Sequence, residues 1–180
     1  GLVVLRRVAA DLAGLAAKGL AIPPLAVNLS FRQFARSEGE ALFFRELDRL
    51  GLAPDRIEFE LTESVSLDEA QGGRALVERL EARGYRLAVD DFGTGYSSLG
   101  ALCGMTNAKL KIDRSLIRAM GEGNRGLAIV DAILRMARAL SIPVVAAGVE
   151  TEAELSTLYA LDCEYGQGFL LARPMSVDDL

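Results

Sequence analysis

Short runs of apolar residues recur along the chain and predict six β-strands. Most of these runs do not alternate between apolar and polar positions. Continuous apolar runs of this length are typical of strands that are covered on both faces, as in a parallel sheet. The predicted strands are Leu25–Leu29, Arg56–Leu61, Arg86–Asp90, Ala108–Ile112, Ile142–Ala146 and Gly168–Leu171.

Between the strands, apolar residues recur three and four positions apart, a spacing that predicts amphipathic helices. The stripes cover residues 2–15, 43–50, 76–80 and 127–140, and the last of these is the clearest. A further helix is predicted to begin at Thr151 and to run toward Leu161, because Glu154 completes a capping box. Helices and strands therefore alternate along the chain, which predicts a parallel sheet with right-handed crossovers.

Polar residues stand where the predicted strands end, and their positions favour a barrel over an open sheet. Groups at the carboxyl ends of successive strands converge on one point when the sheet curls around it, as in a (β/α)8 TIM barrel. In an open, doubly wound sheet, ligands gather instead at one switch point. The strand-end residues are Asn28, Glu60, the adjacent pair Asp90 and Asp91, Lys111, Glu150 and Gln167. We therefore expect an α/β fold of the modified TIM-barrel type.

The chain is shorter than such a barrel. Eight units typically require ~250 residues, whereas this chain has 180 residues and begins on a predicted helix. We expect about six of the eight strands here, in one domain over residues 1–180 that lacks the N-terminal strands. Two open sheet edges invite pairing, so we expect the isolated chain to associate.

Composition narrows the class of function. The net charge of −5 argues against a nucleic-acid polymer as partner, because such binding depends on clustered Lys and Arg. Histidine is absent, which excludes Ser-His-Asp and Cys-His catalysis and every His-ligated metal. Two distant cysteines, Cys103 and Cys163, argue against a zinc site or disulfide framework and favour a cytoplasmic location. The sequence contains no predicted membrane span, and a membrane-anchored parent protein remains compatible with it.

The adjacent carboxylates of Asp90 and Asp91 are the strongest sign of a metal site, because like charges so close together repel unless a cation offsets them. Asn28 and Glu60 add hard oxygen donors, and the set suits Mg²⁺, Mn²⁺ or Ca²⁺. Two bridged ions are the pattern of phosphodiester hydrolysis, in which Lys111 would orient water or neutralise a phosphate oxygen. Taken singly, each residue would also serve as a helix cap or a solvated strand-end charge.

Six motifs give the chain a resemblance to the EAL domains of bacterial cyclic di-GMP signalling. They occur in the family's order and span nearly the whole chain. They are VNLSFRQF (27–34), FELTES (59–64), VDDFGTGYSSL (89–99), LKIDRSLI (110–117), VVAAGVETEAEL (144–155) and GQGFLLARPM (166–175). The resemblance implies a modified TIM barrel that hydrolyses the second messenger cyclic di-GMP to linear pGpG with Mg²⁺ or Mn²⁺, and that Ca²⁺ inhibits.

The resemblance also implies roles for individual residues. The implied metal ligands are Asn28, Glu60, Asp90 and Asp91, the implied catalytic residues are Lys111, Glu150 and Gln167, and the implied loop-stabilising pair is Glu63 and Glu150. Asp90 would be shared between two ions, Lys111 would position the attacking water, and Gln167 would lie at the far rim. The loop DFGTGYSS, held against the metal site by the glutamate pair, is implied to couple dimerisation to activity.

Two departures from the family pattern weaken the expected activity. The Glu-Ala-Leu signature, with its metal-binding Glu, has no match and is expected in the absent N-terminal segment. The family pattern Glu-Gly-Val-Glu is Ala147-Gly148-Val149-Glu150 here, so a catalytic carboxylate is lost at Ala147. Loss of a general base typically lowers a rate by about 10²–10⁴-fold. We therefore expect a degenerate site with little or no hydrolysis, and no bound ion if the degeneracy extends to the metal.

Three functions remain open from the sequence. The first is a binding module for cyclic di-GMP or a protein partner within a larger multidomain regulator, with homodimer formation as a further option. The second is a working phosphodiesterase in which the missing N-terminal part restores the site. The third is a ligand-free scaffold. Ala147 favours the first function, and the remaining metal-site residues argue against the third.

Overall fold

The structure is a computed structural model that describes residues 1–20, 22–30, 34, 37–62, 73–94, 102, 104–105 and 108–176. Helices and strands alternate through most of these residues, although two successive helices follow the fourth strand, and the fold is of the α/β class. The chain divides into two compact units. The first comprises Gly1–Leu61 and Val65–Leu87, and the second comprises Thr62–Ser64 and Ala88–Leu180. Within the described residues, none of the helices combines the length and the apolar character needed to cross a bilayer.

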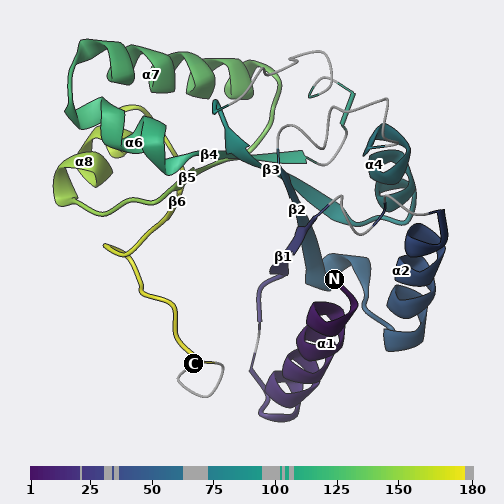
Figure 1. Cartoon of the computed structure of the whole chain (residues 1–180). Coiled ribbons are helices and arrows are strands. Elements are labelled where there is room, and N and C mark those ends of the chain that lie inside the picture. The colour runs from purple at the N-terminus through teal and green to yellow at the C-terminus, as the bar shows by residue number, and fades with distance from the viewer. Residues whose placement is uncertain are drawn as a thin grey trace. The chain divides into compact units, whose positions relative to one another are not determined.

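The first unit contains a parallel strand pair and three α-helices within its described residues (Figure 1). Its elements are α1 (Leu2–Ala17), β1 (Leu25–Leu29), α2 (Ser37–Leu50), a 3-10 turn (Pro54–Arg56), β2 (Ile57–Thr62) and α4 (Gly73–Ala82). β1 and β2 run parallel, with Asn28 opposite Glu60. β2 is buried along almost its whole length although its sequence, IEFELT, alternates apolar and polar residues, so Glu58 and Glu60 are buried along with their apolar neighbours.

Aromatic side chains form part of the core of this unit. Phe43 on α2 packs against Phe59 on β2 with ring centroids 5.6 Å apart, and Phe59 in turn packs against Tyr85 at 5.2 Å. All three residues are buried, and the Tyr85 hydroxyl donates a hydrogen bond of 2.8 Å to the Leu52 carbonyl. The polar end of Tyr85 is therefore satisfied inside the core.

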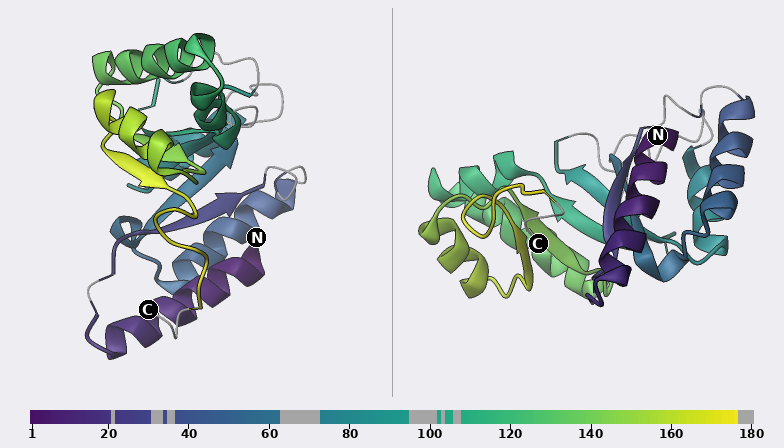
Figure 2. Two further views of the ribbon diagram at one scale, coloured as in Figure 1. Left: turned by 90° about the vertical axis from the view of Figure 1, so that its left-hand side faces the viewer. Right: turned by 90° about the horizontal axis from the view of Figure 1, so that it is seen from below.

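An ion-pair cluster joins α1 to α2, which lie side by side (Figure 2). The carboxylate of Glu46 on α2 accepts hydrogen bonds from Arg49 at 2.7 and 2.9 Å and from Arg6 of α1 at 2.6 Å. These two guanidinium groups, Arg49 first, lower the pKa of Glu46 from 4.5 to about 2. Glu46 therefore stays ionised at pH values at which an ordinary glutamate would already be protonated.

The second unit carries the later strands in the order β3-β4-β5-β6. Its elements are β3 (Arg86–Phe92, which enters the unit at Ala88), β4 (Ala108–Ile112), α6 (Arg114–Gly121), α7 (Asn124–Ala139), β5 (Val144–Ala147), α8 (Glu152–Ala160) and β6 (Tyr165–Gln167). β4 pairs with β5, and β5 with β6, in parallel register. α6 packs against both α7 and α8 (Figure 1). The carboxyl ends of these parallel strands therefore lie at the same edge of the sheet.

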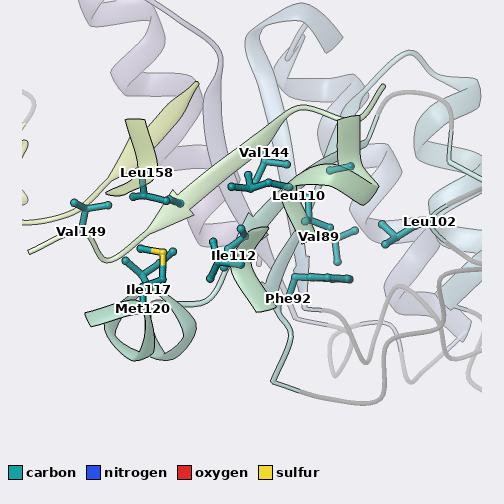
Figure 3. Close-up of a cluster of buried hydrophobic side chains, with 14 residues drawn as sticks. Val89, Phe92, Leu102, Leu110, Ile112, Ile117, Met120, Val144, Val149 and Leu158 are labelled. Atoms are coloured by element: carbon teal, nitrogen blue, oxygen red, sulfur yellow. The ribbon is translucent and has the colours of Figure 1, made fainter. Parts of the chain in front are cut away.

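The core of the second unit lies between its strands and these helices (Figure 3). Leu110 and Ile112 of β4 are fully buried, together with Ile117 of α6. At Gly126 on α7, an added Cβ would lie 2.0 Å from the Ala119 carbonyl oxygen, so α6 and α7 approach closely there. This packing accompanies the position of α6, which begins just after the carboxyl end of β4.

Several predicted elements are confirmed and others need correction. The strands at Leu25–Leu29 and Ala108–Ile112 are confirmed as predicted, and the capping box of Thr151 and Glu154 is present. The third strand runs two residues beyond its predicted end, to Phe92. Helix α6 was missed, because it follows β4 after a single residue. The helix expected between the third and fourth strands falls largely outside the described residues.

The sixth predicted strand, Gly168–Leu171, is wrong, because the strand is Tyr165–Gln167 and the predicted segment is a turn. The amide groups of Leu171 and Ala172 both donate to the Gly168 carbonyl at 3.0 Å, which closes the turn. An added Cβ on Gly168 would lie 2.1 Å from the Val149 carbonyl oxygen. The apolar run after Gly168 therefore marks a tight contact between two loops, not an extended strand.

Candidate functional site

A cavity of about 330 Å³ lies in the second unit, at the carboxyl ends of its strands. Six of the residues singled out from the sequence line it. They are Asp90 and Asp91 of β3, Lys111 of β4, Ala147 at the end of β5, Glu150 just beyond it, and Gln167 at the end of β6. The sequence argument that strand ends converge is thus supported for this unit.

Asp90 and Lys111 form an ion pair on one wall of the cavity. The Lys111 Nζ donates to Asp90 Oδ2 at 3.1 Å, and the two side chains are 9% and 18% exposed. A charge pair with so little exposure is costly to break, typically by about 3–5 kcal/mol, because removal of one partner leaves the other charge buried. The pair therefore fixes the position of the lysine ammonium group at the strand ends.

Asp91 adopts a backbone conformation that is uncommon for a residue with a side chain. Its φ is +56°, in the left-handed region that aspartate tolerates better than most residues. Its amide donates to Asp90 Oδ1 at 3.0 Å, and its carbonyl accepts from the Thr94 hydroxyl at 2.9 Å. These bonds hold the turn in which the strand ends.

The electrostatic surroundings of Asp91 are unfavourable for its charge. Burial, and then the negative charges of Asp90 and Asp113, raise the pKa of Asp91, while Lys111 acts in the opposite direction. The carboxylate cluster is therefore short of positive charge at this end of the sheet. A bound cation would correct that deficit.

The loops after β5 and β6 interlock on the opposite wall. Ala147 lies opposite Gln167 in the register of the two strands. Beyond them, the Val149 amide donates to the Gln167 carbonyl at 3.0 Å. Gly148 has φ +77°, and an added Cβ would lie 2.4 Å from the Cβ of Arg114. Only a residue without a side chain fits between this loop and the start of α6.

The backbone of Glu150 is fixed by the helix that follows it. The amide groups of Glu150 and Thr151 donate to Glu154 Oε2 at 2.8 and 2.9 Å. The capping box of α8 thereby sets the direction in which the loop leaves the cavity. The carboxylate of Glu150 stays exposed on this wall.

Three further cavity residues were missed by the sequence reasoning: Asp113, Arg114 and Phe169. Asp113 is the N-cap of α6, where its Oδ1 accepts from the Ser115 amide at 2.9 Å. Burial raises its pKa, but the hydrogen bonds from Ser115 and the Arg114 amide outweigh burial and lower it overall. The signal for Asp113 was present, since a capping residue followed directly on a predicted strand.

Two of the expected metal ligands belong to the first unit. Asn28 and Glu60 are register neighbours near the carboxyl ends of β1 and β2. Glu60 is 8% exposed, and Asn28 is exposed. Glu63 and positions 95–98 of the DFGTGYSS loop lie outside the described residues, so the loop-stabilising pair stays a prediction.

The donor chemistry of these residues fits a hard divalent cation. Asp90, Asp91, Glu60 and the Asn28 amide offer oxygen atoms, which Mg²⁺ and Mn²⁺ prefer. The pKa of Asp91 is raised first by burial and then by the neighbouring charges of Asp90 and Asp113, and a bound cation would offset both effects. Across the described residues, no group of three His, Cys, Asp or Glu side chains is arranged to hold a metal ion. The set that the resemblance implies includes the Asn28 amide, and of its carboxylates Asp90 and Asp91 line the cavity of the second unit.

Comparison with known proteins gives a family match over almost the whole chain. The family model described as "EAL domain" matches residues 1–174. An "uncharacterized signaling protein" of Caulobacter vibrioides is 44% identical over 98% of this chain and 21% of its own length. The bifunctional diguanylate cyclase/cyclic di-GMP phosphodiesterase MucR of Pseudomonas aeruginosa is 42% identical over 87% of this chain and 23% of its own length. The chain thus spans about a fifth of the length of these curated relatives.

Solved structures agree with the sequence match. The PaMucR phosphodiesterase in complex with c-di-GMP has a TM-score of 0.89 at 38% identity, covering 99% of this chain and 72% of that chain. The BlrP1 protein of Klebsiella pneumoniae, solved with manganese and cyclic di-GMP, has a TM-score of 0.76 at 34% identity, covering 91% of this chain and 42% of that chain. The predicted fold class and the resemblance stated from the motifs are both confirmed.

Proposed function

This chain belongs to the EAL domain family, and from that premise we propose that it binds cyclic di-GMP and hydrolyses it weakly or not at all. The ligand would occupy the cavity at the strand ends of the second unit, where Asp90, Lys111 and Gln167 meet. Both similar solved structures contain cyclic di-GMP, which supports this choice of ligand.

Ala147 is the observation that carries the proposal. It lines the cavity at the end of β5, opposite Gln167, where the family pattern has a glutamate. A methyl group neither accepts a proton nor orients water, so this wall of the cavity lacks the carboxylate that the resemblance assigns to catalysis. Glu150 lies three residues further along the loop, with its amide held by the α8 cap, so its backbone does not occupy the position of the lost carboxylate.

The remaining residues are suited to holding a phosphodiester. The Lys111 ammonium group, held by Asp90, would donate a hydrogen bond to a phosphate oxygen or to a nearby water. The Gln167 side chain, exposed at the end of β6, would contact the ligand at the opposite rim. These contacts orient a ligand without requiring its hydrolysis.

We include a divalent cation, Mg²⁺ or Mn²⁺, in the proposal. The residues that would hold it are Asn28, Glu60, Asp90 and Asp91. When bound, such an ion would offset the negative charge of the phosphodiester and of the carboxylates around it. Manganese in a similar EAL structure supports a divalent ion, while the identity of the ion for this chain belongs to the proposal.

Calorimetry combined with a turnover assay tests this function. We expect the protein to bind cyclic di-GMP, more tightly with Mg²⁺ than with a chelator, and to form little or no linear pGpG over the same period. Robust hydrolysis would overturn the degenerate assignment. The absence of any nucleotide binding, with or without the ion, would overturn the binding function and favour a scaffold.

A working phosphodiesterase is the second candidate, and the buried pair of Lys111 and Asp90 favours it. Binding of a phosphodiester does not require the lysine to be fixed by a carboxylate, whereas positioning of an attacking water would. In this alternative, Lys111 or a neighbouring carboxylate would compensate for Ala147. A Lys111→Met variant would then lose turnover while the unsubstituted protein shows it.

The wider assignment follows from the same premise. We propose that the domain works within a larger bacterial signalling protein, in the cytoplasm, and that the other domains of that protein are its partners. The multidomain relatives, of which this chain spans about a fifth, support this proposal. Homodimer formation through the DFGTGYSS loop stays a proposal of the same kind.

A further inference from the structure

An exposed aromatic ring stands on the rim of the candidate site, and the function described above does not use it. Phe169 follows β6 by two residues, lines the cavity and is 53% exposed. The guanidinium carbon of Arg173 lies over its ring, 5.0 Å from the centroid. A half-exposed phenylalanine is ordinary on a surface, but this one is held at the edge of a polar cavity by the surrounding backbone.

The turn that carries Phe169 is rigidly anchored on both sides. Gly168 packs against the backbone of Val149, and the Leu170 amide donates to the Val149 carbonyl at 3.1 Å. Leu170 itself packs against the buried core, and two amide groups further along donate to the Gly168 carbonyl. Because its neighbours are fixed, Phe169 cannot withdraw into the core. The ring of Phe169 therefore stays at the rim of the cavity, next to its polar side chains.

The charge of the cavity shows why such a face matters for a nucleotide. Four of its lining residues are acidic (Asp90, Asp91, Asp113 and Glu150), and two are basic (Lys111 and Arg114). Phosphate groups alone would gain little from this balance of charge without a bound cation. A nucleobase is neutral, and stacking on an aromatic face is a favourable contact that does not depend on the cation.

We propose that Phe169 is the stacking platform for one guanine base of cyclic di-GMP, which would lie on the ring face that the Arg173 guanidinium does not cover. This inference rests on the proposed function, because it places the base of the same ligand in the same cavity. Phe169 would thus supply affinity at the rim, and Lys111 and Gln167 would contact the phosphodiester. In a site with impaired hydrolysis, base stacking is a contact that favours retention of the ligand.

The chain contains no tryptophan, which permits a direct spectroscopic test. In a Phe169→Trp variant, stacking of guanine on the indole would quench its fluorescence when cyclic di-GMP is added. The signal is taken as the difference between the variant and the unsubstituted protein. A matched Tyr159→Trp variant places the reporter on α8, at a residue that is 75% exposed and does not line the cavity. We expect quenching in the first variant and none in the control.

Affinity measurements on two smaller substitutions complete the test. Phe169→Ala and Phe169→Leu should both weaken binding of cyclic di-GMP by about tenfold or more, measured by calorimetry, since both remove the aromatic face. Leucine keeps the apolar bulk and protects the fold. If Phe169→Leu binds as tightly as the unsubstituted protein, the ring is only an apolar wall and the proposal is wrong.

Failure of this inference is distinguishable from failure of the proposed function. If calorimetry shows saturable binding but Phe169→Trp fluorescence does not change at saturation, the stacking proposal alone is overturned. If the unsubstituted protein binds no cyclic di-GMP at all, the proposed function is overturned and the stacking proposal with it.

Discussion

Asp91 combines several features that are energetically unfavourable for the folded state. It has a left-handed backbone, its carboxylate is partly desolvated, and two further carboxylates, Asp90 and Asp113, lie near enough to raise its pKa. None of these features stabilises the fold. Strain and perturbed pKa values of this kind cluster at functional sites, where a ligand supplies the missing interaction.

Substitution of Asp91 by Asn should therefore raise thermal stability slightly when no divalent ion is present. The raised pKa means that the folded state binds the proton more tightly than the unfolded chain does, so ionised Asp91 destabilises the fold at neutral pH. That penalty disappears as the pH falls through the raised pKa, and Asn removes it at every pH while tolerating the same backbone. We expect a slightly higher melting temperature at pH 7 in chelator, measured by thermal denaturation.

The same variant should respond less to Mn²⁺ than the unsubstituted protein. Binding of an ion stabilises the folded state by mass action, and Asp91 is one of the proposed oxygen donors. A lower melting temperature of Asp91→Asn in chelator would show that the ionised carboxylate stabilises the fold. An undiminished Mn²⁺ response would remove Asp91 from the proposed ligands.

Residues at strand ends could be predicted from the sequence, whereas residues in the loops could not. Asp90 and Lys111 were found because parallel strands bring their carboxyl ends together. Gln167 preceded the predicted sixth strand and lies at a carboxyl end only because the observed strand is Tyr165–Gln167. Phe169 was missed, because its apolar neighbours were interpreted as part of a strand. The spacing of apolar residues along the sequence does not distinguish a short apolar turn from a short buried strand.

At the scale of elements, the contact between the loops after β5 and β6 shapes one wall of the cavity. Gly168 lies directly against the backbone of Val149, which in turn bonds to Gln167 and Leu170. The two loops therefore hold Gln167 and Phe169 in fixed positions relative to Ala147. The sequence motif contained both glycines, Gly166 and Gly168, but not the information that only the second meets another backbone.

A Gly168→Ala substitution should destabilise the protein and weaken ligand binding together. The new Cβ would lie 2.1 Å from the Val149 carbonyl oxygen and 2.3 Å from its amide nitrogen, so the backbone must shift. Overpacking of this kind typically costs about 1–3 kcal/mol, which chemical denaturation would measure as a lower free energy of unfolding.

Gly14→Ala on α1 provides the matched control. An added Cβ at Gly14 meets nothing within 4 Å, and alanine favours a helix interior by roughly 0.5–1 kcal/mol over glycine. The control should be neutral or stabilising. Equal stability of the two variants would contradict the tight loop contact at Gly168.

Helix α6 shows how a missed element affects a site. It begins directly after β4 and Asp113, and its first residue, Arg114, packs against Gly148. Strict alternation of helix and strand, which guided the prediction, allows one helix in each crossover. Two helices, α6 and α7, follow β4 instead. The extra helix added Asp113 and Arg114 to the cavity, and neither had been assigned a role.

At the scale of the whole molecule, the sequence predicted the class of fold and the family, and the match over residues 1–174 confirms both. Alternation of helix and strand was sufficient for the class, and the order of six motifs was sufficient for the family. The position of the site in the second unit required the structure, because four strands of that unit bring their ends to one cavity. Two further proposed ligands, Asn28 and Glu60, lie in the first unit.

The central claim is that Ala147 separates binding from hydrolysis, and one measurement tests it most directly. The rate of linear pGpG formation is compared between the unsubstituted protein and an Ala147→Glu variant, at saturating cyclic di-GMP with Mn²⁺. We predict that the variant is faster by about 10²–10⁴-fold, while the unsubstituted protein binds the ligand but turns it over slowly. Equal rates in the two proteins would contradict the account, because the carboxylate at position 147 would then have no part in the reaction.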